Sequence, residues 1–446
     1  MIELLSPAGT LKSMRYAFAY GADAVYVGQP RYSLRVRNNE FNHIENLSRA
    51  IEYARSHHKK LYLAVNISPH NDKIRSFVRE MEPIIALAPD ALIMSDPGLI
   101  MLVREHWPAQ DIHLSVQANA TNWATVKFWQ QQGISRVILS RELSLDEIAE
   151  IKQRVPEMSL ETFVHGALCI AYSGRCLLSG YMTHRDSNQG ACTNSCRWRY
   201  SATPAVATAE GDIVARAGGV ECEDAKRVVQ EFTPVSDDDL GYVLLEEENR
   251  PGEYMPAFED EHGTYIMNSK DLRAVQHVKQ LIDIGVDSLK IEGRTKSPFY
   301  VARTAQVYRR AIDDALQQKD FDWQLMDDLE VLANRGYTEG FYRRHLPKEY
   351  QNYEQNSSLS GTQQFVGEVK SVDHKSATAT IVVKNKFCVG DRLQVITPKG
   401  DHSFTLESIW SERGEALAVA PGDGWVVNIP LPAPGLDQYA LLTRAN

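Results

Sequence analysis

Short apolar segments, most of them followed by a stretch of helical periodicity, recur along the first 165 residues of this chain. The seven segments span residues 3–5, 24–27, 61–65, 91–94, 113–116, 136–139 and 160–164. Strands that alternate with amphipathic helices in this way predict parallel β/α units. The signals of helix ends agree, because Ser144-Leu-Asp-Glu147 is a capping box and Gly133 is placed to end the preceding helix.

An eighth unit follows only after more than a hundred further residues, with a strand over 288–291 and a helix over 299–316. Eight such units predict an α/β fold, a (β/α)8 TIM-like barrel, whose seventh and eighth strands are separated by a Cys-rich insertion. An open doubly wound parallel sheet is the alternative, although eight strands fit closure better. We therefore expect a barrel domain over 1–345 that carries an insertion over 166–275.

The sequence pattern changes after the barrel. Residues 346–364 are mostly polar, as expected of a linker, and apolar and polar residues alternate afterwards, as in Thr378–Val383. Turn signals such as Pro398-Lys-Gly400 interrupt this part of the chain. We expect a small all-β barrel domain over 365–446, which serves either as an RNA-binding module or as a packing module.

Composition and charge narrow the class of protein. No run approaches the ~18 apolar residues of a membrane span, and the N-terminus lacks the pattern of a secretory signal. Six cysteines are too few for a disulfide framework, which favours a cytoplasmic chain with reduced thiols. The net charge is −10, but residues 201–262 hold 16 acidic and 4 basic residues. The rest of the surface can therefore still present basic patches to a nucleic acid.

Polar side chains gather at the carboxyl ends of the expected strands, which is the end of a barrel where active sites lie. Some of them can equally serve as helix N-caps, since strand-to-helix loops are polar for that reason as well. We interpret the whole set as a candidate active-site face. Its members are Ser6, Asn66, Ser95, Asp96, Gln117, Asn119, Ser140, Arg141, His165, Glu292 and Arg294.

Four cysteines fall within 28 residues, directly after the seventh expected strand: Cys169, Cys176, Cys192 and Cys196. Four converging thiolates need a cation, and zinc or an iron–sulfur cluster is the natural partner. The paired Cys-x-x-Cys knuckles of zinc ribbons are absent, and so is the Cys-x3-Cys-x2-Cys triplet of radical enzymes. The spacing thus predicts a metal or cluster site and favours iron–sulfur over zinc only weakly. Four free buried thiols are the remaining alternative.

Basic and aromatic residues accompany these cysteines. Residues 165–200 contain four arginines, of which Arg175 and Arg197 adjoin cysteines, and a single acidic residue. Guanidinium groups can offset the charge of thiolates, and they can also bind a carboxylate or a phosphate. Trp198 and Tyr200 alternate with arginines, which suits the stacking of RNA bases but is equally expected of core aromatic residues.

The segment from Glu161 to Ser179, ETFVHGALCIAYSGRCLLS, resembles the signature of peptidase family U32, a family long described as collagenase-like peptidases. Further motifs extend the resemblance over nearly the whole chain, and in combination they are similar to the tRNA-hydroxylating branch of that family. These motifs are SPAG, YSLR, RDSNQGACTNSCRW, FEDEHGTYIMNSKDL, LKIEGRTKS and NKFCVGD.

The resemblance implies a barrel-like domain, a small C-terminal β-domain and an iron–sulfur cluster, 4Fe–4S by type, bound by Cys169, Cys176, Cys192 and Cys196. Relatives do not all use the same four cysteines, so Cys222 is the alternative for the fourth ligand. The implied activity is oxygen-independent hydroxylation of the wobble uridine of tRNA to 5-hydroxyuridine, with prephenate as the source of the hydroxyl group. The implied partners are the tRNA anticodon loop, prephenate and the iron–sulfur assembly machinery.

The resemblance also suggests roles for individual residues. Prephenate is a dicarboxylate, so we expect cationic clamps, and adding a hydroxyl group to uracil requires proton transfers. The expected proton carriers are Glu161, His165 and Glu292. The expected substrate-binding residues are Arg175, Arg197 and Arg294, with Arg35 in reserve, together with Gln117 and Asn119.

Other functions remain open at this point. A peptidase would use Cys169 with His165, because no His-Glu-x-x-His motif and no Gly-x-Ser-x-Gly motif is present. Three further cysteines nearby favour ligation over nucleophilic catalysis. A non-catalytic RNA-binding protein with a structural zinc is another alternative, and so is an enzyme that acts on a small aromatic compound.

Overall fold

In a computed structural model the chain forms two compact units. The first comprises residues 1–166, 274–333 and 360–446, and the second comprises residues 167–273 and 334–359. The structure describes residues 2–29, 31–33, 39–167, 200–207, 213–215, 243–247, 254–260, 263–266, 271–332, 334, 336–343, 363–432, 436 and 439–445.

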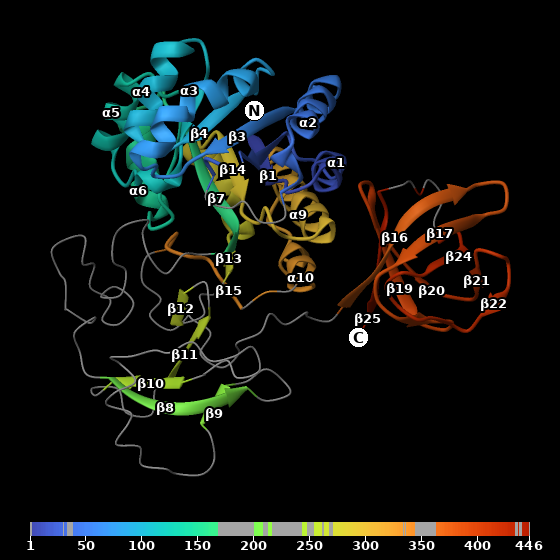
Figure 1. Ribbon diagram of the computed structural model, residues 1–446. Coiled ribbons are helices and arrows are strands. Elements are labelled where there is room, and N and C mark those ends of the chain that lie inside the picture. Colours follow the sequence, from blue (N-terminus) through green and yellow to red (C-terminus); the bar gives the residue numbers. More distant parts are fainter. Residues whose placement is uncertain are drawn as a thin grey trace. The chain divides into compact units, whose positions relative to one another are not determined.

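Eight parallel strands form a closed barrel (Figure 1). They are β1 (Glu3–Pro7), β2 (Ala24–Gly28), β3 (Lys60–Val65), β4 (Ala91–Met94), β5 (Ile112–Leu114), β6 (Arg136–Ile138), β7 (Ser159–Ala167) and β14 (Ser288–Ile291). The last strand closes the barrel, because Ser288 of β14 pairs with Glu3 of β1 and with Glu161 of β7. This closure confirms the predicted TIM-like barrel and shows that the doubly wound alternative is wrong.

The fifth strand differs from its expected range, and the difference shapes the candidate site. Strand β5 ends at Leu114, and the chain continues as a single 3-10 turn, η2 (Val116–Ala118). This turn ends at Asn119, whose backbone adopts the left-handed conformation with a φ of 52°. Asparagine tolerates that conformation better than most residues, so the turn redirects the chain just outside the barrel.

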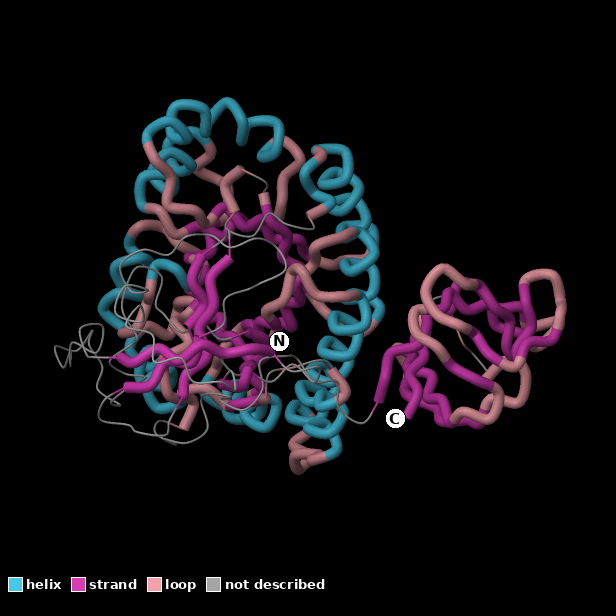
Figure 2. Tube along the Cα trace, turned by 60° about the horizontal axis from the view of Figure 1, so that its bottom comes forward, coloured by secondary structure: helices cyan, strands magenta, loops and turns pink. Residues whose placement is uncertain are grey.

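Helices surround the strands of the barrel (Figure 2). The capping box predicted for α6 is confirmed, since Ser144 and Glu147 each accept a hydrogen bond from the other's backbone N–H. No helix among the described residues is long and apolar enough to cross a bilayer. The helices are α1 (Leu11–Ala19), α2 (Ile44–Ser56), α3 (Asn71–Ile85), α4 (Pro97–His106), α5 (Trp123–Gln131), α6 (Leu145–Arg154), α8 (Val278–Ile284), α9 (Pro298–Leu316) and α10 (Gln324–Glu330), with 3-10 turns η1 (Glu40–Asn42) and η6 (Val275–His277).

The second unit contains an antiparallel five-stranded sheet, which the sequence analysis did not anticipate. Its strand order is β12-β11-β10-β8-β9. A separate short strand, β13 (Asp271–Arg273), pairs in parallel with β15 (Tyr337–Thr338). The strands of the sheet are β8 (Tyr200–Ala207), β9 (Ile213–Ala215), β10 (Val243–Glu247), β11 (Tyr254–Asp260) and β12 (Gly263–Ile266).

The C-terminal part is an antiparallel all-β domain, as predicted. Eight strands follow the order β20-β19-β25-β16-β17-β24-β21-β22, and β18 pairs with β23. Every second residue of β17 is buried, which is the alternation seen in the sequence. The strands are β16 (Gln363–Asp373), β17 (Thr378–Val383), β18 (Phe387–Cys388), β19 (Arg392–Thr397), β20 (Gly400–Thr405), β21 (Ile409–Ser411), β22 (Ala416–Leu417), β23 (Val419–Ala420), β24 (Val426–Pro430) and β25 (Leu441–Ala445).

Candidate active site at the carboxyl end of the barrel

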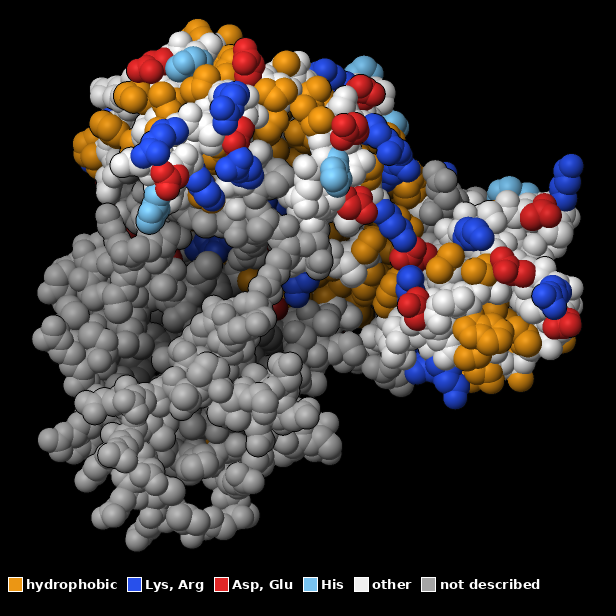
Figure 3. Space-filling model, in the orientation of Figure 1, with side chains coloured by type: hydrophobic (Ala, Val, Ile, Leu, Met, Phe, Trp, Pro, Cys, Tyr) orange, Lys and Arg blue, Asp and Glu red, His pale blue; other side chains and the backbone are white. Residues whose placement is uncertain are grey.

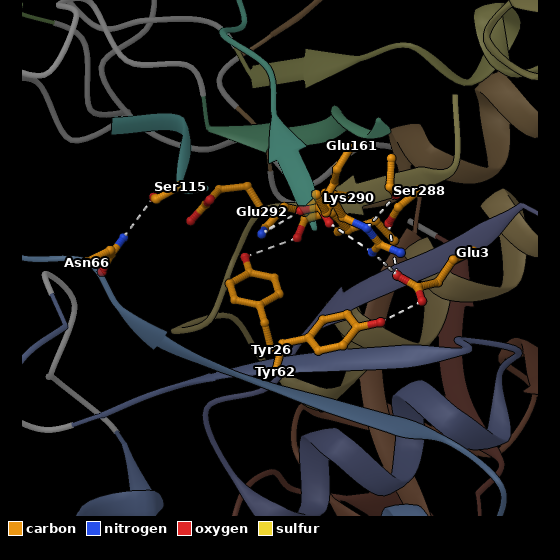
Figure 4. A network of polar contacts seen from close by, with 12 residues as sticks. Glu3, Tyr26, Tyr62, Asn66, Ser115, Glu161, Ser288, Lys290 and Glu292 are labelled. Atoms are coloured by element: carbon orange, nitrogen blue, oxygen red, sulfur yellow. Dashed lines mark hydrogen bonds and ion pairs between the residues drawn. The ribbon is translucent and has the colours of Figure 1, made fainter. Parts of the chain in front are cut away.

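Oppositely charged side chains alternate through the interior of the barrel (Figure 4). The guanidinium of Arg136 on β6 lies 2.5 Å from Glu3 Oε1 on β1 and 3.3 Å from Glu161 Oε2 on β7. Lys290 Nζ on β14 lies 2.8 Å from Glu161 Oε1. The hydroxyl of Tyr62 donates a hydrogen bond of 2.7 Å to Glu3 Oε2. Because isolated charges are costly to bury, this alternation is what allows four charged groups to occupy the barrel core.

The buried surroundings shift the pKa values of these groups. Burial raises the pKa of Glu3, but the charge of Arg136 and hydrogen bonds from Arg136 and Tyr62 outweigh burial, so the pKa lies below its ordinary value. Burial lowers the pKa of Lys290, although the carboxylate of Glu161 opposes this shift. Burial and the charge of Arg136 together lower the pKa of His113 well below its usual range, so its imidazole is neutral. Glu3 is the first residue of β1 and Arg136 is the first residue of β6. Both therefore lie at the amino end of the barrel, where residues contribute to stability and not to an active site.

Three further charged side chains lie at the opposite, carboxyl end of the strands. Glu292 and Arg294 follow β14, and Arg141 follows β6. Arg141 Nη2 lies 3.3 Å from Glu292 Oε2, and its guanidinium lies over the Phe163 ring, 3.9 Å from the ring centroid. Arg294 donates from Nη1 to Ser33 Oγ at 2.8 Å. Arg141 beside the carboxylate of Glu292, and Arg294 at the same end of the barrel, are planar cations that can bind an anionic ligand, and the carboxylate can exchange a proton with it.

Backbone contacts hold Glu292 in place. Its N–H donates to the carbonyl oxygen of His165 at 2.8 Å, and its own carbonyl oxygen accepts from the hydroxyl of Tyr300 at 2.8 Å. Gly166 packs directly against it, because a Cβ at Gly166 would lie 2.5 Å from the carbonyl oxygen of Glu292. Gly28 makes room for Arg294, since a Cβ at Gly28 would lie 2.2 Å from Arg294 Nη1. The carboxyl end of the barrel, here called its mouth, therefore depends on two glycines for the placement of Glu292 and Arg294.

The two glycines are expected to respond differently to substitution by alanine. Gly166→Ala adds a Cβ against backbone at a φ of +101°, so it is expected to lower the free energy of unfolding by about 2 to 4 kcal/mol. Gly28→Ala meets side-chain atoms, Arg294 Nη1 and Ser33 Oγ, which can shift, so the loss is expected to be smaller, about 1 kcal/mol, as the guanidinium moves and its hydrogen bond to Ser33 weakens. Urea unfolding of both variants checks this prediction, and equal losses would contradict it.

Amide and hydroxyl side chains line another part of the same end. Asn66, after β3, donates from Nδ2 to Gln117 Oε1 at 2.6 Å and to Ser115 Oγ at 3.4 Å (Figure 4). The hydroxyl of Ser115 also donates to Gln117 Oε1, at 3.1 Å. Asn119 Nδ2 donates to the carbonyl oxygen of Gln117 at 3.3 Å. These groups present both donors and acceptors, which suits recognition of a polar ring such as a nucleobase.

The structure brings some of the predicted site residues together and separates others. Glu292, Arg294, Gln117 and Asn119 all follow the carboxyl ends of strands, as expected. Glu161 lies elsewhere, because it pairs in register with Ser288, the first residue of β14, whereas Glu292 follows the last. At a rise of about 3.3 Å per residue the two carboxylates belong to positions roughly 13 Å apart along the strand.

His165, the third predicted proton carrier, is 1 % exposed. Its ring packs against Tyr300 and Tyr308, with centroid distances of 5.8 and 5.6 Å, and its Nδ1 lies 3.4 Å from the Tyr308 hydroxyl. His165 therefore belongs to the buried packing around Glu292, whose N–H donates to the carbonyl oxygen of His165. Among the described residues no group of three or more His, Cys, Asp or Glu side chains could hold a metal ion. Predicted residues outside the described part of the chain are Arg35, Cys169, Arg175, Cys176, Cys192, Cys196 and Arg197.

The sequence analysis missed two features of the barrel, one at its carboxyl end and one in its interior. Arg141 belonged to the set of strand-end polar residues, but nothing in the sequence indicated that it contacts Glu292, which is 151 positions away. Lys290 stands within a strand that is buried along its whole length, and that position was itself a signal, since a lysine in a buried strand needs a partner. The partner, Glu161, follows only from the register of β7 with β14.

The closed barrel defines a protein of the TIM-barrel class, and its polar carboxyl end is the candidate ligand-binding face. Residues 9–352 match Peptidase family U32, and residues 361–443 match the Peptidase family U32 C-terminal domain. The chain belongs to peptidase family U32.

Three relatives have names that state a function. The chain is 61 % identical over 442 residues to "tRNA hydroxylation protein P" of Escherichia coli, covering 99 % of this chain and 96 % of that protein. It is 59 % identical over 442 residues to the Haemophilus influenzae protein of the same name, with the same coverage. It is 28 % identical over 437 residues to "23S rRNA 5-hydroxycytidine C2501 synthase" of Escherichia coli, covering 95 % of this chain and 56 % of that protein.

Proposed function

We propose that this protein is a tRNA-modifying enzyme that hydroxylates the wobble uridine to 5-hydroxyuridine without molecular oxygen. Prephenate would supply the hydroxyl group, and an iron–sulfur cluster would be the cofactor. The observation that carries the proposal is the identity of 61 % over 99 % of the chain to a protein named for tRNA hydroxylation. The likeness to a 5-hydroxycytidine synthase adds a relative whose name describes the same change to a pyrimidine ring in RNA.

Four cysteines, Cys169, Cys176, Cys192 and Cys196, provide a thiolate donor set suited to an iron–sulfur cluster. When bound, such a cluster supplies one-electron redox chemistry. Assembly of the cluster would make the iron–sulfur assembly machinery a partner of this chain. Zinc also binds four thiolates, so the metal content of the purified protein distinguishes the two cases.

The residues at the mouth of the barrel support roles in binding and proton transfer. Arg141 and Arg294 are cations of fixed orientation that can bind the carboxylates of prephenate. The amide of Gln117 can pair with the polar edge of uracil, which an anticodon loop presents unstacked. In the product a hydroxyl group replaces the hydrogen on C5 of uracil, which is a two-electron oxidation of the ring. With prephenate as the hydroxyl donor, its C–O bond would break and prephenate would accept the two electrons, while a base must accept the proton from C5. Glu292 is the carboxylate placed for this role.

The test is hydroxylation under strict exclusion of oxygen. Protein purified without oxygen is incubated with an unmodified tRNA transcript, a reductant and prephenate that carries 18O in its hydroxyl group, and the nucleosides are analysed by mass spectrometry. The proposal expects 18O-labelled 5-hydroxyuridine at the wobble position and about four iron and four sulfide per chain. Colourless protein with one zinc and no modified base would overturn the proposal in favour of an RNA-binding protein.

Replacement of Glu292 is expected to separate chemistry from binding. Glu292→Gln keeps the shape of the side chain but removes the proton acceptor, so kcat is expected to fall about 100-fold or more. Iron content and tRNA affinity are expected to remain those of the wild type. Glu105→Gln, an exposed position on α4, is the matched control. A kcat within a few-fold of the wild type would remove Glu292 from the reaction.

The peptidase alternative draws no support from the described residues. The base that Cys169 would need, His165, is buried and packed between Tyr300 and Tyr308. A cysteine peptidase instead presents its nucleophile and base together in an accessible cleft.

A further inference from the structure

Four exposed cations form a surface beside the mouth of the barrel: Arg31, Lys73, Arg75 and Arg79, here termed the α3 basic surface. Helix α3 begins at Asn71, a few residues after the carboxyl end of β3, so its first turn lies at the rim of the mouth. Figure 3 shows Lys and Arg side chains gathered on the part of the barrel where α3 lies in Figure 1.

Buried contacts fix the loop after β2 onto α3. The side chain of Tyr32 is fully buried, its ring meets Phe77 edge-on, and its hydroxyl donates to Glu80 Oε2 at 2.8 Å. Burial raises the pKa of Tyr32, so its hydroxyl stays protonated and remains a donor. Lys73 Nζ donates to the carbonyl oxygen of Arg31 at 3.0 Å. The cations of the α3 basic surface are therefore carried by a loop and a helix that are tied together.

Three acidic residues of α3, Asp72, Glu80 and the exposed Glu82, offset part of this charge and leave the four cations with a balance of +1. Glu80 forms an ion pair with Arg31 and is only 19 % exposed, whereas Arg31 is 59 % exposed. Asp72 pairs with Arg75 at 3.1 Å on the outside, where such a pair is worth little. Among the described residues no ion pair holds Arg79. Arg75 and Arg79 are four positions apart on the helix. They therefore project from the same side, with their Cβ atoms ~6 Å apart.

The charge on another flank of the barrel has the opposite sign. Residues 313–330, from the end of α9 through α10, hold seven acidic residues and a single lysine. A polyanion that approaches the barrel is repelled from that flank and attracted to the α3 basic surface. The asymmetry orients the polyanion with respect to the mouth.

We propose that the α3 basic surface binds the phosphate backbone of the tRNA whose base enters the mouth of the barrel. This inference rests on the proposed function and adds the place where the RNA is held. Exposed Lys and Arg side chains neutralise phosphates without reading the sequence, so they position the RNA while the mouth selects the base. Arg75 and Arg79, one helical turn apart, can contact successive phosphates of one strand, while Lys73 and Arg31 lie on another side of α3, toward the loop after β2.

The test is the salt dependence of tRNA binding by a triple variant, Lys73→Gln, Arg75→Gln and Arg79→Gln, in the full chain. Each lost phosphate contact lowers the slope of log K against log salt by about 0.7 to 0.9. We expect the slope to fall by about 2 units and the affinity for an unmodified tRNA transcript to fall about 10- to 100-fold at low salt. The variants replace exposed side chains, so the thermal unfolding midpoint is expected to stay within a few degrees.

A matched control removes the same charge elsewhere. Lys279→Gln, Arg310→Gln and Lys319→Gln lie on α8, on α9 and just after α9, where each side chain pairs with an aspartate. The control is expected to bind tRNA with the wild-type slope. An unchanged slope in the α3 variant, or an equal loss in the control, would overturn the inference and leave the proposed function intact.

Two further outcomes are distinguishable. If the wild-type protein binds no tRNA and forms no 5-hydroxyuridine, the proposed function fails, and the surface as an RNA site fails with it. If the α3 variant keeps its affinity for tRNA but loses binding to vesicles of phosphatidylglycerol, the surface recognises a membrane and the inference is overturned. Loss of tRNA binding alone supports it.

Discussion

Arg136→Ala is expected to lower the free energy of unfolding by about 3 to 5 kcal/mol, because it leaves two buried carboxylates without their shared cation. The guanidinium lies between Glu3 and Glu161; without it Lys290 would remain to pair with Glu161, and Glu3 would keep only the more distant and half-exposed Lys60, at 3.8 Å, among the described residues. A loss of this size is a large part of the stability of an ordinary domain. Urea unfolding followed by tryptophan fluorescence measures it.

The pH dependence of this loss separates charge from packing. In the wild type the pKa of Glu3 is lowered, so its contribution to stability is present above its unfolded-state pKa and disappears as pH falls through the folded-state value. In Arg136→Ala the carboxyl group of Glu3 loses the charge and the hydrogen bond that lower its pKa, so its burial then favours protonation. We therefore expect the difference between variant and wild type to shrink from pH 7 toward pH 4.

A surface arginine provides the comparison for this prediction. Arg154 on α6 is 59 % exposed and pairs with Glu150 at 3.7 Å. Arg154→Ala is expected to cost no more than about 0.5 kcal/mol, and this cost has no steep pH dependence. If Arg136→Ala cost as little, or if its cost did not change with pH, the interior ion pairs would not stabilise the barrel.

The architecture was predictable because barrel strands are buried on both faces. They appear in the sequence as short continuous apolar segments, and most of them are followed by a helical pattern, in places with clear end signals such as the capping box at Ser144. Counting eight units then predicted closure. The second unit's five-stranded sheet was missed, because strands such as β10 and β11 lie in the acidic stretch 201–262, where charge masks the alternation.

The candidate site was predictable only in part, for a reason of register. Residues that follow a strand are at the carboxyl end whatever the register, so Glu292 and Arg294 were placed correctly. Residues within a strand depend on how neighbouring strands are staggered. Strand β7 is longer than expected, and its pairing with β14 puts Glu161 beside Ser288 and Lys290 instead of at the mouth.

Cys169→Ala is expected to abolish hydroxylation and to remove the iron from the protein at the same time. Under the proposed function Cys169 is one of four cluster ligands, and three thiolates bind a cluster far less firmly than four. The expected result is colourless protein without 5-hydroxyuridine in its product tRNA. Iron and sulfide analysis, the visible spectrum and nucleoside mass spectrometry are measured on the same anaerobic preparation.

The chain supplies its own control for this experiment. Cys388 is a free cysteine on β18 of the C-terminal β-domain, where it is partly buried. Cys388→Ala removes a thiol outside the proposed ligand set, so iron content and hydroxylation are expected to match the wild type. Cys196→Ala and Cys222→Ala then decide the fourth ligand, since only the true ligand should release iron. A Cys169→Ala protein that is free of iron yet still hydroxylates tRNA would show that the reaction does not need the cluster.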